Sequence, residues 1–96
     1  MAHYIALIHK EAEAVYGVSF PDVLGVITAG ETIDEAMEQA SEVLAFAAED
    51  WALHNEADFP APRTIDQLRR DRQFLADSID AVVAAVPLRS MAAQTA

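Results

Sequence analysis

The stretch that most constrains the fold runs from Tyr16 to Ala36 and reads YGVSFPDVLGVITAGETIDEA. Two short apolar runs flank a proline turn, and a glycine and a helix-start signal follow them. Proline lacks a backbone donor and has a fixed φ angle, so it ends a strand, and the aspartate after it favours a turn. The stretch therefore predicts a strand, a turn, a second strand and a capped helix in one continuous segment.

Three short runs near the start of the chain have the alternation that is typical of β-strands. His3–Lys10 carries apolar residues on both faces, and Val15–Phe20 carries its bulky residues on one face. The third run is Gly25–Ala29, in which Gly25 can take a positive φ angle. The short connections between these runs predict an antiparallel meander.

Thr32 opens the one long helix of the chain with the pattern T-x-x-E. Its hydroxyl is expected to accept from the amide of Glu35, and the Glu35 side chain is expected to accept from the amide of Thr32. Apolar residues then recur at intervals of three and four until about His54, which predicts one face packed on the sheet. They are Ile33, Ala36, Met37, Ala40, Val43, Leu44, Ala47 and Trp51.

The rest of the chain predicts a short helix and a last strand. The helix runs from Thr64, with the capping pattern T-x-x-Q, to about Arg70. The segment DRQFLADSID has no clean period and is interpreted as irregular or as a further helical turn. AVVAAVPL, residues 81–88, is typical of a strand buried on both faces. The chain is therefore predicted to be one α+β domain over residues 1–88, with a flexible tail at 89–96.

The order β-β-β-α-(α)-β also predicts a sheet topology. A helix between the third and fourth strands is interpreted as a crossover, which places the fourth strand parallel to the first and third. The prediction is a four-stranded mixed sheet of order 3-2-1-4 with one long helix on one face. The other face is then expected to expose apolar side chains, which favours a homodimer or another complex. The alternative is that the second, short helix packs on that face.

The charge of the chain bears on its partners. The net charge is −10, so direct binding to nucleic acid is not expected, whereas a basic protein partner is favoured. Cysteine is absent, which excludes disulfides and thiol chemistry and suits the cytoplasm. No apolar run approaches the roughly 20 residues that a membrane span needs.

No set of residues points to catalysis, to a metal ion or to a cofactor. His3 and His9 share a strand face, but about 20 Å of strand separates them, which is too far for one metal ion. Ser19 lacks the G-x-S-x-G turn, and the glycines match no phosphate loop. Some carboxylates of the long helix lie off its apolar stripe and are interpreted as a solvated face or a docking surface. They are Glu38, Glu42 and Glu49.

The opening stretch and its flanks resemble a known family, the HicB-like antitoxins. The similarity covers Tyr4 to Leu88 and includes YIALIHKE before the stretch and PAPRTIDQLRRD and AVVAAVPL after it. Its most specific part is the F-P-D turn with the T-A-G-x-T run. Val23 and Leu24 stand where the family usually has a leucine and then a proline. The residues that carry the signature are Gly17, Phe20, Pro21, Asp22, Gly25, Gly30, Thr32 and Glu35.

The resemblance implies a partial RNase H-like fold without nuclease activity. It also implies an antitoxin of a type II toxin–antitoxin system that binds a HicA-like mRNA-cleaving ribonuclease and blocks its active site. Such a toxin is expected to be basic. Many family members also carry a C-terminal DNA-binding domain, for which this chain, ending soon after Leu88, leaves no room. It is expected to be either a short member that lacks this domain or a piece of a longer protein. The alternative is an orphan HicB-like domain that self-associates and binds another protein or a small ligand without catalysis.

Overall fold

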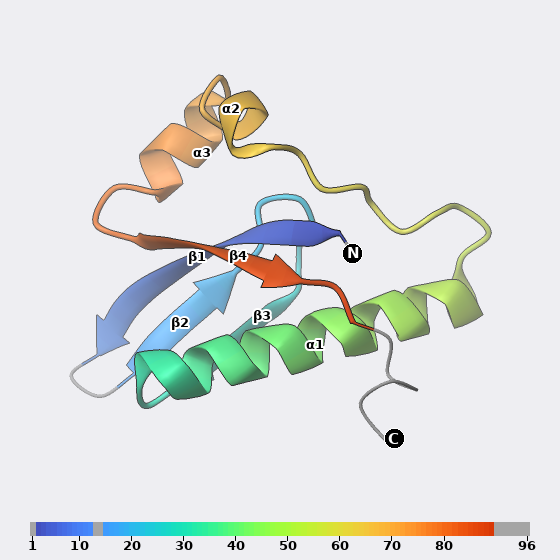
Figure 1. Ribbon diagram of the computed structural model, residues 1–96, viewed down its shortest axis with the longest axis horizontal. Helices are drawn as coiled ribbons and strands as arrows, with labels where there is room; N and C mark the ends of the chain where they lie inside the picture. Colours follow the sequence, from blue (N-terminus) through green and yellow to red (C-terminus); the bar gives the residue numbers. More distant parts are fainter. Residues whose placement is uncertain (1, 13–14, 90–96) are drawn as a thin grey trace.

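The computed structural model of the chain describes residues 2–12 and 15–89. Within these residues no helix is long and apolar enough to cross a membrane. Of the predicted tail at 89–96, all but Arg89 lies outside the described residues. The α+β order is confirmed, and the segment of unclear period forms a short helix (Figure 1). The elements are β1 (His3–Ala12), β2 (Val15–Ser19), β3 (Ile27–Gly30), α1 (Ile33–His54), α2 (Ile65–Leu68), α3 (Arg72–Asp77) and β4 (Val82–Pro87).

The sheet has the predicted strand order, β3-β2-β1-β4. The prediction of a mixed sheet is wrong, because β4 pairs antiparallel with β1, with Tyr4 opposite Val86 and Leu7 opposite Val83. A single crossover helix would have made β4 parallel. Instead, the chain after α1 runs back to the end of the sheet at which α1 begins, so β4 runs in the same direction as α1 (Figure 1).

The larger core lies between the sheet and α1. The helix contributes Ala36, Ala40 and Leu44, all fully buried, and alanines allow it to lie close to the strands. The closest approach is at Gly30, where an added Cβ would lie 2.5 Å from the backbone nitrogen of Ala36, so only glycine fits. The buried residues of this core are Tyr4, Ala6, Ile8, Val18, Phe20, Val23, Ala36, Ala40, Leu44 and Val86.

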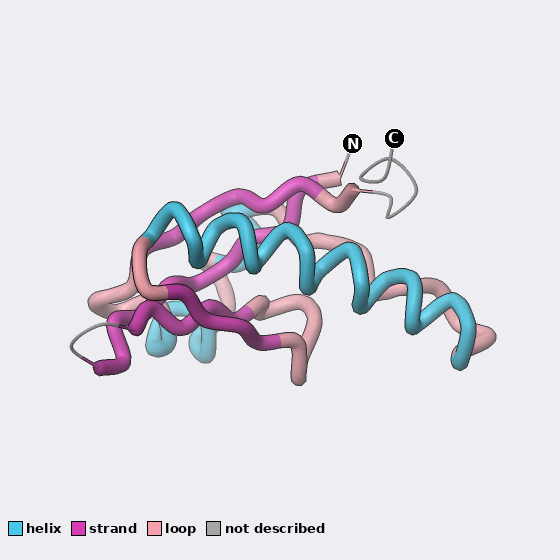
Figure 2. The backbone as a smooth tube through the Cα atoms, turned by 90° about the horizontal axis from the view of Figure 1, so that it is seen from below, coloured by secondary structure: helices cyan, strands magenta, loops and turns pink. Residues whose placement is uncertain are grey.

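The start of α1 differs in one bond from its prediction. Thr32 caps the helix, and its hydroxyl accepts from the amide of Glu35 at 3.0 Å. The Glu35 carboxylate, however, accepts from the amide of Glu31 at 3.3 Å rather than from Thr32. The complete capping box is at α2, between Thr64 and Gln67. At the other end, α1 extends beyond the strands in two perpendicular views (Figures 1 and 2).

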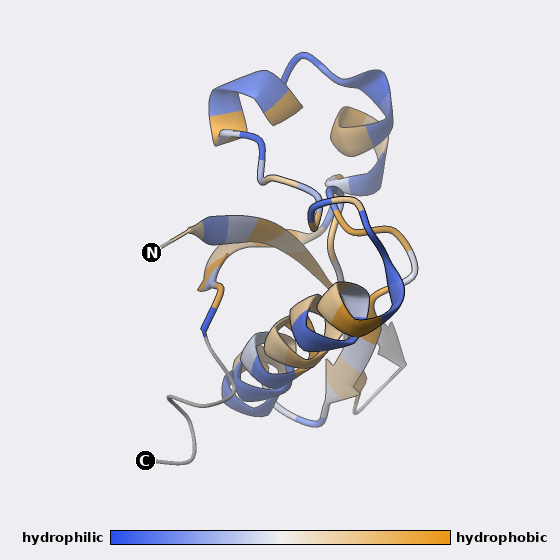
Figure 3. Ribbon diagram, turned by 90° about the vertical axis from the view of Figure 1, so that its right-hand side faces the viewer, coloured by the Kyte–Doolittle hydropathy of each residue, from blue (hydrophilic) through white to orange (hydrophobic). Residues whose placement is uncertain are grey.

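The opposite face of the sheet is partly covered by α2 and α3 (Figure 3). Leu68 of α2 and Phe74 of α3 are buried against Leu7 of β1. The prediction that this face is bare is therefore wrong over β1, and the alternative, a short helix packed there, is correct. The physical reason is that two short capped helices each supply one large apolar side chain to the same point of the sheet.

Charged side chains hold the chain between α1 and α2 in place. The Arg63 side chain donates from Nε to Asp22 Oδ1 at 2.6 Å and from Nη1 to Asp71 Oδ2 at 2.9 Å. The Arg63 backbone amide also donates to Asp22 Oδ2, at 2.7 Å. Asp22 belongs to the F-P-D turn, and Asp71 caps α3. These contacts, named here the Arg63 clamp, fix the α2–α3 arm (residues 64–78) to the turn.

Tyr4 secures the same segment from inside the core. Its hydroxyl donates to the carbonyl of Pro60, and its ring lies 5.8 Å from that of Phe59, centroid to centroid. Burial, and then the negative charge of Asp22, raises the pKa of Tyr4. The hydroxyl therefore keeps its proton and remains a donor.

Removal of the Asp22 carboxylate should loosen the α2–α3 arm. The Asp22 side chain is only 7% exposed, and Asp22→Ala removes both bonds that it accepts from Arg63. We expect a loss of about 2 kcal/mol in the free energy of unfolding, measured by urea denaturation, and faster hydrogen exchange in α2 and α3. In the control Asp50→Ala, an exposed pair with His54 is lost, so the change should stay below about 0.5 kcal/mol. Equal stability of the two variants would contradict the role of the clamp.

Asp71 should make the stability of the fold depend on pH in the acid range. The hydrogen bond from Arg63, and then those from the amides of Gln73 and Phe74, lower the pKa of Asp71. A carboxyl whose pKa is lower in the folded state stabilises that state above the unfolded pKa, and this stability is lost as the pH falls through the folded pKa.

We therefore expect Asp71→Asn to flatten the fall in unfolding free energy between about pH 5 and pH 2, measured by urea denaturation at each pH. Asparagine retains a side-chain oxygen that can cap α3, so the variant isolates the charge. Asp66→Asn, on the exposed side of α2, is the control and should follow the wild-type slope. A wild-type slope in Asp71→Asn would contradict the assignment.

Candidate functional site

The side of α1 that faces away from the sheet is a mixture of carboxylates and large apolar side chains. Helical spacing places Glu38, Glu42, Phe46, Glu49 and Leu53 along one side of the helix, and all are exposed. Phe46 is 61% exposed and Leu53 is 78% exposed, which is high for side chains of this kind. These residues are named here the acidic helix face.

In the described part of the chain, no salt bridge joins the carboxylates of this face to a basic side chain, although Arg89 borders the same two hollows as Glu38 and Glu49. Among the described residues, the ion pair on α1 is the exposed one between Asp50 and His54, 3.2 Å apart. The helix has no lysine or arginine, and a row of unpaired carboxylates creates a negative potential that attracts a basic partner. Its acidic residues are Asp34, Glu35, Glu38, Glu42, Glu49 and Asp50.

Four of the six basic side chains of the chain lie on or next to the α2–α3 arm. Arg69, Arg70 and Arg72 are exposed on the α2–α3 arm, and Arg63 is engaged in the clamp. The arm packs on the sheet face opposite α1 (Figure 3), and its three arginines are balanced by three aspartates, whereas α1 has six carboxylates and no lysine or arginine. A basic partner is therefore attracted to the α1 side.

The predicted acidic residues and the exposed apolar residues combine in one surface. Glu38, Glu42 and Glu49 lie where the helical pattern places them, off the apolar stripe. Sequence reasoning missed Phe46 and Leu53, because it counted apolar residues of the core side only. Their positions on the polar side of the helical pattern were the signal that could have identified them.

The signature residues lie mainly in structural roles. Phe20 is buried in the larger core and Pro21 is half-buried beside it in the turn. Gly25 has a φ angle of +88°, a region that suits glycine. Asp22, Gly30, Thr32 and Glu35 form the clamp, the contact with α1 and the helix cap described above. Gly17 lines an open cavity.

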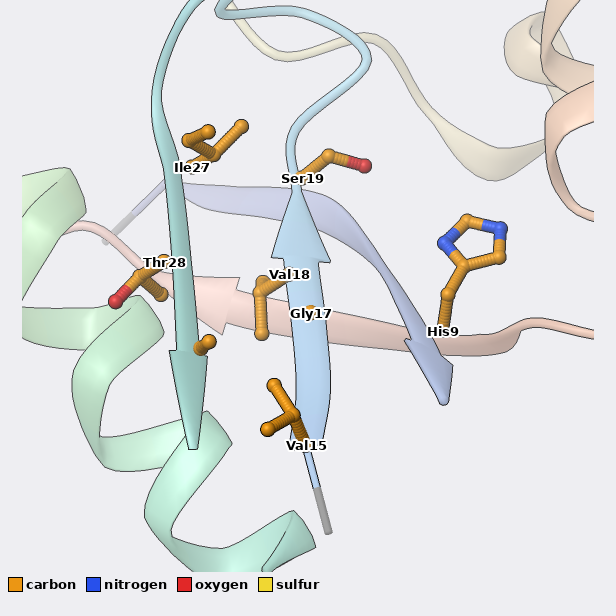
Figure 4. A pocket seen from close by; sticks show the side chains of 8 residues that line it. His9, Val15, Gly17, Val18, Ser19, Ile27 and Thr28 are labelled. Atoms are coloured by element: carbon orange, nitrogen blue, oxygen red, sulfur yellow. The ribbon is translucent and has the colours of Figure 1, made fainter. Parts of the chain in front are cut away.

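That cavity is on the part of the sheet that the α2–α3 arm leaves uncovered (Figure 4). It is open to solvent, has a volume of about 400 Å³ and is lined by β1, β2 and β3. The lining is mainly apolar, and Ile27 is 70% exposed. The cavity therefore suits the binding of an apolar side chain of a ligand or partner better than it suits catalysis. The lining residues are His9, Val15, Gly17, Val18, Ser19, Ile27, Thr28 and Ala29.

The histidines do not converge on a common point. His9 Nε2 lies 2.7 Å from the carbonyl oxygen of Asp77, so this nitrogen carries the hydrogen and donates. His54 lies at the end of α1 with Asp50. In the described part of the chain, no group of three or more His, Asp or Glu side chains is placed to hold a metal ion.

Comparison with known proteins gives a consistent result. The model of the HicB-like antitoxins of bacterial toxin–antitoxin systems matches residues 4–95. Among solved structures, the antitoxin HicB of Burkholderia pseudomallei is 30% identical with a TM-score of 0.73, and the match covers 92% of this chain and 64% of that one. This chain thus spans about two thirds of the length of that antitoxin. The search of curated proteins found no match.

Two further solved structures that are similar to this chain are toxin–antitoxin complexes. One, from Streptococcus pneumoniae, is 27% identical with a TM-score of 0.67, and the match covers 92% of this chain and 69% of that one. In the other, a HicA3 and HicB3 complex, the identity is 20% and the TM-score 0.71, with 91% and 98% covered, which shows similarity of fold alone. From its match over nearly the whole sequence, this chain belongs to the HicB-like antitoxin family of bacterial toxin–antitoxin systems.

Proposed function

We propose that this chain is the antitoxin of a type II toxin–antitoxin system and that it binds a HicA-like, mRNA-cleaving ribonuclease and occludes its active site. The observation that carries the proposal is the family match over residues 4–95. The similarity to a toxin–antitoxin complex from Streptococcus pneumoniae supports it. So does the charge of −10, because an enzyme that binds RNA needs a basic surface.

We place the contact with the toxin on the acidic helix face. Phe46 and Leu53 offer apolar anchors, and Glu38, Glu42 and Glu49 surround them with negative charge. Interfaces draw most of their affinity from a few large side chains at the centre, whereas charges at the rim speed and orient the encounter. An aromatic anchor within an acidic rim suits a cationic, RNA-binding groove.

The proposed mode of action is steric and needs no catalytic residue, metal ion or cofactor in this chain. A bound helix excludes mRNA from the groove and replaces the phosphates with carboxylates. Because the target of the toxin is mRNA, we place the complex in the cytoplasm. The RNase H-like description of the fold remains part of this proposal, supported by the order of strands followed by the long helix on one sheet face.

Substitutions on the acidic helix face should weaken the complex in two distinct ways. With an inactivated HicA-like toxin as ligand, Phe46→Ala should raise the dissociation constant about 30-fold, the equivalent of about 2 kcal/mol, mainly through faster dissociation. Glu42→Lys with Glu49→Lys should mainly slow association and reduce its dependence on salt. Surface plasmon resonance separates these rates, and co-expression with active toxin tests whether the wild type restores growth.

Matched controls exist on α2 and α3. Leu75→Ala removes another exposed apolar side chain, and Asp66→Lys reverses another exposed carboxylate, so both should leave binding unchanged. If the wild type neither restores growth nor co-purifies with the toxin, the antitoxin proposal is wrong. If it binds and the controls weaken binding as much as Phe46→Ala does, the acidic helix face is the wrong surface.

A further inference from the structure

The last two turns of α1 have less support than the rest of the helix. Its fully buried side chains are Ala36, Ala40, Leu44 and Ala45, and beyond Ala45 every side chain of the helix is half-buried or exposed. This part of α1 extends beyond the strands (Figures 1 and 2). A short helical segment without packed neighbours is marginal in water, so an end of this kind unwinds unless a side chain holds it.

Trp51 supplies such a contact. Its indole Nε1 donates to the carbonyl oxygen of Ala57 at 2.8 Å, in the segment that returns from α1. Its ring also meets the ring of Phe59 edge-on, with the centroids 5.9 Å apart and the planes at 78°. This is a favourable arrangement for two aromatic rings. Trp51 therefore ties the end of α1 to the chain that follows it.

The contact continues from Phe59 into the larger core. The Phe59 ring packs against that of Tyr4, and the Tyr4 hydroxyl donates to the carbonyl of Pro60. Tyr4 belongs to β1 and is buried in the larger core. Three rings thus connect the sheet to the end of the helix. Tyr4, Phe59 and Trp51 are named here the aromatic brace.

The aromatic brace acts on the side of α1 that is opposite the acidic helix face. At about 100° per residue, Glu49 and Leu53 each lie about 200° around the helix from Trp51. Their side chains therefore point away from the brace, whereas Trp51 points toward it. Leu53 is 78% exposed, so its own contacts do little to hold it in place. Trp51 sets the direction of both side chains through the helix backbone.

Order at this end of the helix bears on affinity. A surface that is ordered before the encounter loses little conformational freedom on binding, whereas a frayed helix end has to be ordered at that moment. Glu49 and Leu53 lie beyond Ala45, whereas Glu38 and Glu42 lie on the part of α1 that packs on the sheet. The brace should therefore matter for the first pair and not for the second.

We propose that Trp51 is a positioning residue for partner binding. Through the aromatic brace it keeps the last two turns of α1 helical, so that Leu53 and Glu49 are already in place when the toxin arrives. Trp51 acts through the backbone and does not itself contact the toxin. This inference rests on the proposed function of the acidic helix face, and its structural part can be measured on the free chain.

Hydrogen exchange in the free chain tests the structural part. Trp51→Ala should speed the exchange of the amides at about residues 50–54 by about 10-fold and leave the sheet and α2 unchanged, because only the helix end then opens. Trp51→Phe keeps an aromatic ring against Phe59 and should exchange at an intermediate rate. Phe46→Ala removes an exposed ring from the same helix and is the control, with wild-type exchange expected. Wild-type exchange in Trp51→Ala would overturn the proposal.

Fluorescence supplies a second check that leaves Trp51 itself unchanged. The chain has one tryptophan, so its emission reports on the brace. Phe59→Leu removes the ring beside Trp51 but keeps an apolar side chain at that position. We expect emission at longer wavelength and faster exchange at the end of α1. An unchanged spectrum together with wild-type exchange would overturn the proposal, because the Phe59 ring would then not hold Trp51.

A double-mutant cycle with an inactivated HicA-like toxin tests the positioning role. In the wild type, Leu53→Ala should raise the dissociation constant about 10-fold. In the Trp51→Ala chain the same change should raise it less than about 2-fold, because Leu53 is then no longer held in place. Glu42→Lys is the control and should have the same effect in both chains. Trp51→Phe should restore most of the affinity that Trp51→Ala loses.

The cycle separates positioning from a general loss of stability, which would leave the effect of Leu53→Ala the same in both chains. An equal effect of Leu53→Ala with and without Trp51, or no effect in either, would overturn the proposal and leave the antitoxin proposal intact. If the wild type does not bind the toxin, the antitoxin proposal is wrong and the positioning role is wrong with it.

Discussion

The contacts of Arg63 with Asp22 and Asp71 fix the position of the segment that follows α1. Arg63 joins the F-P-D turn, whose Asp22 lies 41 residues earlier in the sequence, to the cap of α3, whose Asp71 lies 8 residues later. Since the turn is fixed by Phe20 in the larger core, the clamp transmits that fixed position to the α2–α3 arm. The arm covers Leu7 with Leu68 and Phe74, and its end sets the point at which β4 enters the sheet. The antiparallel direction of β4 follows from this return path.

The parts of the fold that depend on local pattern could be predicted from the sequence. Thr32 and Glu35 marked the start of α1, the alternation of side chains indicated β1 and β2, and the short connections predicted the meander of the first three strands. The direction of β4 could not be predicted in this way, because the crossover rule assumes one helix between two strands, and here the chain reverses once more after α1. The ion pair between Asp22 and Arg63 likewise could not be predicted from local sequence patterns, because each residue by itself is typical of a turn or of the surface.

The candidate site shows the same division. Glu38, Glu42 and Glu49 could be placed on the outer side of α1 from helical spacing alone. Phe46 and Leu53 lie on the same side. An apolar residue on a polar helix face is a stronger sign of a binding surface than an additional apolar residue in the core stripe. The cavity over Gly17 depended on how far the α2–α3 arm extends over the sheet, which follows from the clamp. The size and apolarity of a surface thus depend on the tertiary structure, whereas its charge can be predicted from the sequence.

Different surfaces of this small domain have different tasks. The sheet interior and the clamp maintain the shape, and we propose that the acidic helix face meets a basic partner. On this proposal, binding by the chain silences a ribonuclease without any chemistry of its own.

The most direct test titrates this chain into a HicA-like toxin that is cleaving a labelled RNA. We predict that cleavage falls in proportion to the chain added and stops at one chain per toxin, whereas intact RNA alone is unaffected by the chain. Cleavage that continues undiminished in excess chain would contradict it.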